Sequence, residues 1–152
     1  MKQVLLCKLC TKAISKPILI FDESSGYRKG GTGRLRLRAP KGSDHGEITL
    51  RYEAEQPICP IGTGVNAKTL LYKREGHPLN FKPQFYLALE DILETVCNNE
   101  HWCAQCCGAG VSDKPNRSCI CGNPVGFELS ECFTERVFIP NNETTQWQIV
   151  KS

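Results

Sequence analysis

Alternating apolar and polar residues mark two neighbouring stretches of this chain as β-strands. In residues 47–53, Ile48, Leu50 and Tyr52 fall on one face, and charged or hydroxyl residues fall on the other. Residues 34–38 alternate Arg and Leu in the same way. The loop between the two stretches is rich in Gly, Pro and polar residues, so we predict an antiparallel hairpin. Weaker strand patterns lie at residues 17–21, 69–73, 126–129, 136–139 and 146–150.

A helical periodicity takes over in residues 83–97. Pro83 suits the first turn of a helix. One face carries the acidic residues Glu90, Asp91 and Glu94, and the other carries an apolar stripe made of Phe85, Leu89, Ile92, Leu93 and Val96. This pattern predicts one amphipathic helix, about 83–97, packed on a sheet. The expected fold class is therefore α+β, mostly antiparallel β with this one helix, in a single domain spanning residues 1–152.

Composition places the chain among ordinary globular proteins with many turns. Of its 152 residues, 40% are hydrophobic and 23% are charged, and 13 are Gly and 9 are Pro, which excludes collagen, coiled-coil and wholly disordered chains. No apolar run approaches the roughly 18 residues of a membrane span, and the first residues lack the apolar core of a secretory signal. We therefore expect a cytoplasmic protein, in which paired cysteines more often bind metal than form disulfides.

The strongest chemical signal comes from the 10 cysteines. Cys103-Ala104-Gln105-Cys106 and Cys119-Ile120-Cys121 are two close pairs separated by a turn-rich segment, and Gly122 directly follows the second pair. Two such pairs can offer four sulfurs to a tetrahedral Zn²⁺. The pattern resembles the paired knuckles of zinc-ribbon proteins, except that its second pair is C-x-C rather than C-x-x-C. The C-terminal third is therefore predicted to be stabilised by zinc.

A third pair, Cys7 and Cys10, has knuckle spacing near the N-terminus and needs partners. In one arrangement it takes them from Cys97, Cys107, Cys132 and His101. In another, Cys7 and Cys10 join Cys119 and Cys121, which leaves Cys103 and Cys106 for a second site. Spacing does not choose between these arrangements, so we predict one or two Zn²⁺ ions in a subregion formed by residues 97–132 with residues 1–12. The predicted ligands are Cys7, Cys10, Cys103, Cys106, Cys119 and Cys121, with Cys107, Cys132 and His101 as additional candidates.

A shell made only of thiolates is closed to substrate and activates water poorly, so the metal is predicted to be structural. Cys59 and Cys97 lack a paired neighbour and are expected in the core. The sequence of residues 62–69 is similar to a phosphate-binding loop. However, the segment before it has a weak strand pattern, and Gly76 and Pro78 would interrupt any helix after it. A nucleotide-using or thiol enzyme is therefore the weaker alternative, and we predict no catalytic residues and no small-molecule substrate.

Charge is distributed unevenly along the chain. Residues 1–82 hold 15 Lys and Arg against 7 Asp and Glu, whereas residues 83–152 hold 4 against 9. On the predicted hairpin, Arg34, Arg36 and Arg38 share one face and are the candidate partner-binding residues. The first functional hypothesis is non-catalytic recognition of another protein, as an adaptor or inhibitor, with the acidic helix face as a second surface. The alternative is a zinc-containing nucleic-acid-binding protein that uses the basic hairpin. No membrane partner is expected.

Overall fold

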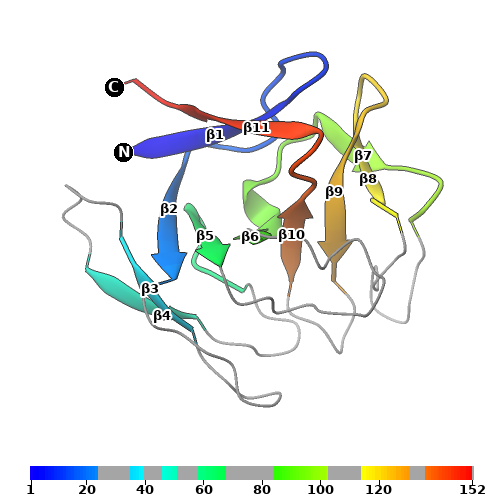
Figure 1. Cartoon of the computed structure of the whole chain (residues 1–152). Coiled ribbons are helices and arrows are strands. Elements are labelled where there is room, and N and C mark those ends of the chain that lie inside the picture. Colours follow the sequence, from blue (N-terminus) through cyan, green and yellow to red (C-terminus); the bar gives the residue numbers. More distant parts are fainter. Residues whose placement is uncertain are drawn as a thin grey trace.

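The computed structural model of the chain describes residues 1–23, 35–39, 46–50, 58–67, 84–102, 114–130 and 136–151. These residues form 11 strands that belong to one sheet (Figure 1). The strands are β1 (Lys2–Cys7), β2 (Ile18–Glu23), β3 (Leu35–Arg38), β4 (Glu47–Leu50), β5 (Thr63–Ala67), β6 (Gln84–Leu87), β7 (Val96–Asn98), β8 (Arg117–Cys119), β9 (Pro124–Leu129), β10 (Val137–Pro140) and β11 (Thr145–Ile149).

The main path of the sheet runs β11-β1-β2-β5-β6-β10-β9-β8-β7, and the β3–β4 hairpin joins it at the side of β2. This path curls into a half-barrel. Among the described pairs, β2 and β5 run parallel and the others are antiparallel. Because β1 pairs with β11, the two ends of the chain lie next to each other at one end of the sheet (Figure 1).

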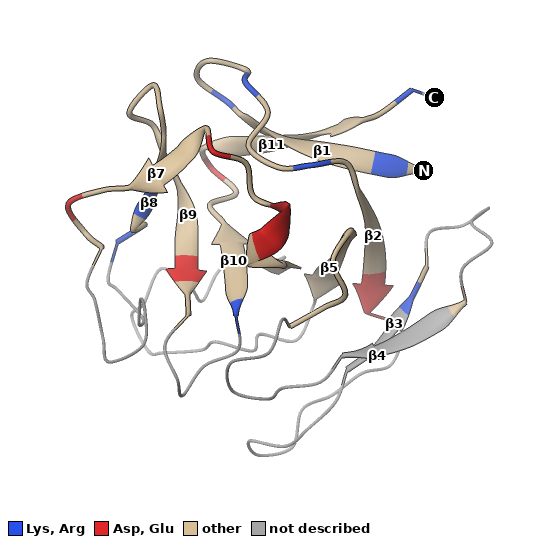
Figure 2. Ribbon diagram, turned by 180° about the vertical axis from the view of Figure 1, so that it is seen from behind, with Lys and Arg blue, Asp and Glu red and all other residues tan. Residues whose placement is uncertain are grey.

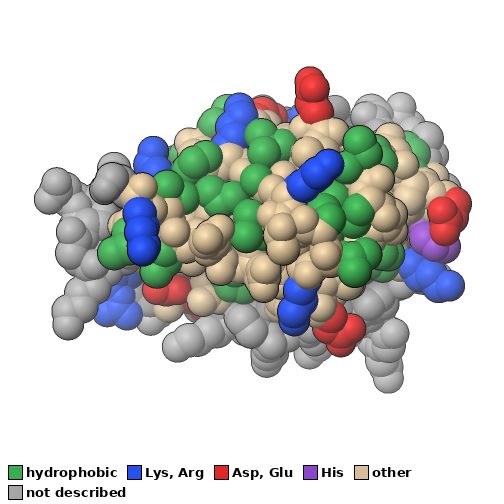
Figure 3. Space-filling view, turned by 90° about the horizontal axis from the view of Figure 1, so that it is seen from above, with side chains coloured by type: hydrophobic (Ala, Val, Ile, Leu, Met, Phe, Trp, Pro, Cys, Tyr) green, Lys and Arg blue, Asp and Glu red, His purple; other side chains and the backbone are tan. Residues whose placement is uncertain are grey.

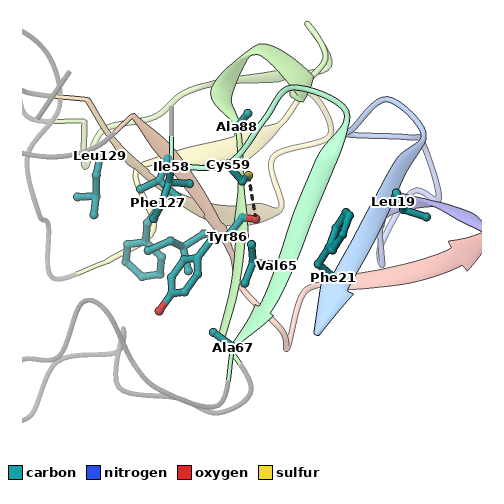
Figure 4. Close-up of a cluster of buried hydrophobic side chains, with 12 residues drawn as sticks. Leu19, Phe21, Ile58, Cys59, Val65, Ala67, Tyr86, Ala88, Phe127 and Leu129 are labelled. Carbon is teal, nitrogen blue, oxygen red and sulfur yellow. Dashed lines mark hydrogen bonds between the residues drawn. The ribbon is translucent and has the colours of Figure 1, made fainter. Parts of the chain in front are cut away.

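Both faces of the central strands are buried, and alternate residues of these strands serve opposite faces. In β2, Leu19 and Phe21 join one apolar cluster, whereas Ile18 and Ile20 join the other. Figure 4 shows the first cluster, in which Tyr86 lies among side chains from β2, β5 and β9. The second cluster includes Cys7, Cys10 and Cys119 and therefore adjoins the cysteine turns described below.

The prediction of an amphipathic helix at 83–97 is wrong. This segment consists of strand β6, a single 3-10 turn η3 (Leu89–Asp91) and strand β7, and no α-helix occurs among the described residues. The apolar run from residue 85 to 89 fits a strand that is covered on both faces, where apolar residues need not alternate with polar ones. Phe85 packs on one face of the sheet and Tyr86 on the other, so the helical spacing of the apolar residues was coincidental. The fold is nearly all β.

The acidic residues of η3, red in Figure 2, are not the exposed acidic face that the predicted helix would have carried, because Asp91 is buried and Glu90 is half-buried. Asp91 is buried, and its Oδ2 accepts a hydrogen bond from the Gly62 N–H at 2.7 Å. Burial raises the pKa of Asp91. Glu90 pairs with Arg136, with Oε1 and Nε 3.4 Å apart. Both carboxylates therefore hold the turn against the sheet.

Most of the predicted strands that lie in the described ranges are confirmed. The β3–β4 hairpin pairs antiparallel, with Arg38 opposite Glu47, and β2, β9, β10 and β11 match four of the weaker patterns. Residues 51–53 and 69–73 lie outside the described residues. β1, β5 and β8 were not predicted. Residues 63–67, in the segment that is similar to a phosphate-binding loop, form β5 in the centre of the sheet. The packing there is tight, because a Cβ on Gly64 would meet Leu87 Cδ2 at 2.8 Å.

Candidate metal centre

The first cysteine pair lies in a closed turn at the end of β1. The N–H of Thr11 donates to the Cys7 carbonyl at 2.9 Å, and the N–H of Cys7 donates to the Lys12 carbonyl at 2.9 Å. Thr11 has a φ of 65°, in the left-handed region that residues with a Cβ seldom adopt. Its hydroxyl donates to the Cys10 carbonyl at 2.6 Å. Cys7 and Cys10 are therefore presented by one compact turn.

The second pair lies in the turn between β8 and β9. The N–H of Cys119 donates to the Asn123 carbonyl, and the N–H of Gly122 donates to the Cys119 carbonyl, both at 2.8 Å. Gly122 has a φ of 94°, as expected for the glycine that follows a metal-binding knuckle. The N–H of Ile120 donates to the Thr95 carbonyl at 2.8 Å, which ties this turn to the segment before β7.

The two turns lie at the top of the molecule in Figure 1, and they bring four sulfurs together. The Sγ atoms of Cys7, Cys10, Cys119 and Cys121 all lie within 4.8 Å of one another. The Sγ atoms of Cys7 and Cys121 are 3.6 Å apart, and so are those of Cys10 and Cys119. A tetrahedral Zn²⁺ with Zn–S bonds of about 2.3 Å requires sulfurs about 3.8 Å apart. All four cysteines are free, and these separations are too long for disulfides.

Backbone and amide N–H groups surround the sulfur of Cys7. Burial raises the pKa of Cys7, but hydrogen bonds from Asn123 and from the N–H groups of Cys10 and Leu9 outweigh burial and lower it to about 6. N–H groups that point at a thiolate stabilise its negative charge and commonly accompany sulfur ligands. The first turn is therefore built to hold a charged sulfur.

The sulfurs of the second turn hold their protons more strongly in the absence of a cation. Burial, together with the neighbouring sulfurs of Cys10, Cys121 and Cys7, raises the pKa of Cys119 to about 12. For Cys121 the Asn123 N–H lowers the pKa, but burial and the sulfurs of Cys7 and Cys10 outweigh it and the net shift is upward. Four sulfurs this close cannot all ionise without a positive charge among them, and a divalent cation supplies that charge.

Asn123 supports the centre and was missed in the sequence. Its Nδ2 donates to the Cys7 Sγ at 3.2 Å and to the Thr144 carbonyl at 3.1 Å. Thr144 O also accepts the Lys8 N–H at 2.9 Å, so Asn123 links both cysteine turns to the start of β11. The only available signal was its position directly after Gly122, since an amide side chain at that point can reach a sulfur of the facing turn.

Of the arrangements that the spacing left open, the structure brings together the N-terminal pair and Cys119 with Cys121. Cys103, Cys106, Cys107 and Cys132 lie outside the described residues, so their predicted role as ligands stays a prediction. His101 and Cys97 are described and are not part of the four-sulfur group.

The two unpaired cysteines differ from each other. Cys59 is buried in the first apolar cluster, as predicted, and burial raises its pKa to about 12. Its Sγ donates to the Tyr86 carbonyl at 3.8 Å (Figure 4). Cys97 is exposed on β7, so the prediction that it belongs to the core is wrong.

The predicted arginine surface is described only in part. Arg38 is exposed at the end of β3, and the register of the hairpin places Glu47 across from it. For Arg36 the structure describes the backbone alone, and Arg34 lies outside the described residues. The role of these three residues in partner binding stays a prediction.

Comparison with known proteins gives no match. No protein-family model fits the chain, and no curated protein or solved structure is similar to it. Within the described ranges, no helix has the length and apolar character needed to cross a membrane. The features of the described residues that bear on function are therefore the four-sulfur centre and the surface around it.

Proposed function

We propose that this chain is a structural zinc protein that acts by non-catalytic recognition of another protein. The observation that carries the proposal is the convergence of Cys7, Cys10, Cys119 and Cys121 within 4.8 Å, with no disulfide among them. Four thiolates satisfy the tetrahedral coordination of Zn²⁺, so no position stays open for a substrate or a reactive water. The ion holds the fold together.

The position of the centre explains why zinc is needed there. Its ligands are separated by 109 and 114 residues in the two closest sulfur contacts. The ion therefore joins the N-terminal turn to the β8–β9 turn, two segments that are not neighbours in the sheet. The free energy of zinc binding adds to the free energy of folding, because the unfolded chain has no such arrangement of sulfurs for the ion to bind.

The surface next to the ion supports recognition of a protein rather than of nucleic acid. The residues at the tips of the two turns are large and apolar: Leu9 is 70% exposed and Ile120 is 67% exposed. Seen from above, apolar side chains on this face are interspersed with basic and a few acidic side chains (Figure 3). Two exposed aliphatic side chains on either side of one centre suit contact with another protein, whereas single-stranded nucleic acid is usually held by stacking on aromatic rings.

Elemental analysis of the purified protein tests the metal centre. We expect the Cys121→Ser variant to hold one zinc ion per chain fewer than the wild type. Cys97→Ser is the matched control, because Cys97 is also an exposed thiol but lies outside the four-sulfur group. Equal zinc content in the wild type and the Cys121→Ser variant would overturn the proposed site.

Cross-linking of the zinc-loaded protein in cell extract, followed by mass spectrometry, tests the recognition function. A true partner should cross-link beside the two tips, for example at the exposed Lys8, and lose binding when Leu9→Ser and Ile120→Ser are combined. Zinc content must be unchanged in that variant, so that loss of binding is not loss of the fold. Binding to nucleic acid that weakens steeply with salt, and that the double variant does not affect, would support the alternative function instead.

A further inference from the structure

Strand β11 lies at one end of the sheet and presents an open hydrogen-bonding edge. The N–H of Lys8 donates to the Thr144 carbonyl, and the N–H of Val150 donates to the Lys2 carbonyl, both at 2.9 Å. These two bonds fix the alternation of the β1–β11 ladder: even-numbered residues of β11 bond to β1. The N–H and C=O groups of Thr145, Trp147 and Ile149 therefore point away from β1, and no strand in the described part of the chain pairs with them.

Two other edges in the described part of the sheet, those of β1 and β7, are closed. The edge of β1 that faces away from β11 pairs with β2 only as far as Gln3. After that residue its backbone groups have other partners: the Leu5 N–H donates to Ser15 Oγ, and the Leu5 carbonyl accepts the Ile14 N–H. At the opposite end of the sheet, β7 has only three residues, and its Val96 donates to Leu93 and accepts from Arg117. Short strands and occupied backbone groups are the usual ways in which proteins protect sheet edges. β11 has five residues and lacks this protection.

The sequence of β11 also lacks the residues that normally prevent edge pairing. Thr-Gln-Trp-Gln-Ile contains no charge and no proline. Gln146 and Gln148 are exposed on one face, and Ile149 is 55% exposed. Thr145 turns its side chain to the core face, opposite Cys7, and its backbone lies on the free edge. An extended strand can therefore add to this edge.

We propose that the occupant is β11 of a second copy of this chain, paired antiparallel about a two-fold axis at Trp147. The three outward-facing residues are symmetric about Trp147, so this axis satisfies the outward groups of both copies at once. Trp147 then faces Trp147 of the second copy, and Ile149 faces Thr145. Gln146 faces Gln148, and their amides can donate to and accept from each other. The interface is isologous, as in most protein dimers.

The charges that flank β11 fit this register. Glu143 is exposed two residues before the strand, and Lys151 is exposed two residues after it. Antiparallel pairing about Trp147 brings Glu143 of each copy to the end of the interface where Lys151 of the other copy lies. Opposite charges therefore meet twice, and like charges are kept apart. A parallel pairing of the two copies would bring like charges together.

Sedimentation equilibrium of the zinc-loaded protein tests the proposal. A short edge interface belongs to the small, weak class, so we expect a monomer–dimer equilibrium with a Kd in the micromolar range, about 1–100 μM. Gln146→Glu with Gln148→Glu places carboxylates opposite each other in both symmetric pairs. This double variant should weaken dimerisation about tenfold at low salt.

The matched variant combines Gln146→Glu with Gln148→Lys at the same two positions. It places opposite charges across both pairs and should dimerise at least as tightly as the wild type. Mixing the Gln146→Glu/Gln148→Glu variant with the Gln146→Lys/Gln148→Lys variant should restore dimers through complementary pairing. Zinc content and thermal midpoint, measured on each variant, confirm that the monomer fold is retained.

Three results would overturn the proposal. The first is a wild-type protein that stays monomeric at concentrations of about 500 μM, well above the micromolar range of weak interfaces. The second is a dimer whose stability is the same in all the charge variants, because its interface would then lie elsewhere. The third is a monomer that binds a strand of a different protein through β11, since the edge would then be heterologous.

Discussion

The two cysteine turns place their sulfurs in the same way but are built differently. In each turn the first cysteine is buried, Cys7 and Cys119, and the second lies further out, Cys10 and Cys121. The C-terminal turn connects two strands that pair with each other, and its left-handed position is a glycine. The N-terminal turn has one more residue between its cysteines and a threonine in the left-handed position.

This difference shows which turn depends more on the rest of the molecule. The β8–β9 turn is closed by bonds within residues 119–123 and by the ladder of its own hairpin. The N-terminal turn is also closed by bonds within residues 7–12, but the strand that it follows, β1, has its main partner in β11, from the far end of the chain. A local hairpin can keep its shape without metal, whereas a turn held by a distant strand needs the shared ion more.

Metal removal should have the largest effect and should separate the two turns. We expect a chelator to speed amide hydrogen exchange more in residues 7–12 than in residues 119–123. The chelator should also lower the thermal midpoint of unfolding strongly, because the free energy of zinc binding contributes to the free energy of folding. Lowering the pH from about 7 to about 5 should release the metal in the same way, since protons compete for the sulfurs. Equal exchange in both turns would contradict the proposed difference.

Asn123→Ala should have the next largest effect, because this residue bonds to both turns. Loss of its contact with Cys7 Sγ should weaken zinc affinity about 10- to 100-fold, as for other residues that support metal ligands. Competition with a chromophoric zinc chelator measures this change. Asn98→Ala is the control, because Asn98 is exposed on β7, and it should leave the affinity unchanged. An unaltered affinity in Asn123→Ala would remove this residue from the centre.

Gly122→Ala should destabilise the protein by about 1–2 kcal/mol, because alanine is strained at positive φ. A Cβ at this position meets nothing within 4 Å, so the cost arises from the backbone alone. Gly46→Ala is the matched control: its Cβ also meets nothing, and its φ is not in the left-handed region. Urea unfolding of the two variants should differ by the full backbone cost.

Thr11→Gly should have the smallest effect, within about 0.5 kcal/mol of the wild type. Glycine relieves the left-handed strain at this position but increases the entropy of the unfolded chain. It also loses the hydroxyl bond to the Cys10 carbonyl. The same urea experiment measures the change. A destabilisation as large as that of Gly122→Ala would show that the threonine side chain, rather than the backbone conformation, holds the N-terminal turn.

Part of the fold could be predicted because its signals are local. Residues 34–38 and 47–53 alternate along the chain, so their hairpin was predicted from spacing alone. The helix predicted at residues 83–97 was wrong because β6 is buried on both faces and its run of apolar residues is equally compatible with a helix. β1 and β5 were missed because they lack alternation and are stabilised by partners distant in sequence.

The cysteine chemistry followed from the sequence by itself, because the spacing of Cys7 with Cys10 and of Cys119 with Cys121 is a property of a few adjacent residues. Which pairs meet was decided only by the tertiary structure. The strand order brings the end of β1 beside the β8–β9 turn, although more than a hundred residues of chain separate them. Pairing between such distant strands produces no periodic pattern in the sequence of either segment. The open edge of β11 is likewise invisible in its sequence, because an edge is defined by the strand that is absent beside it.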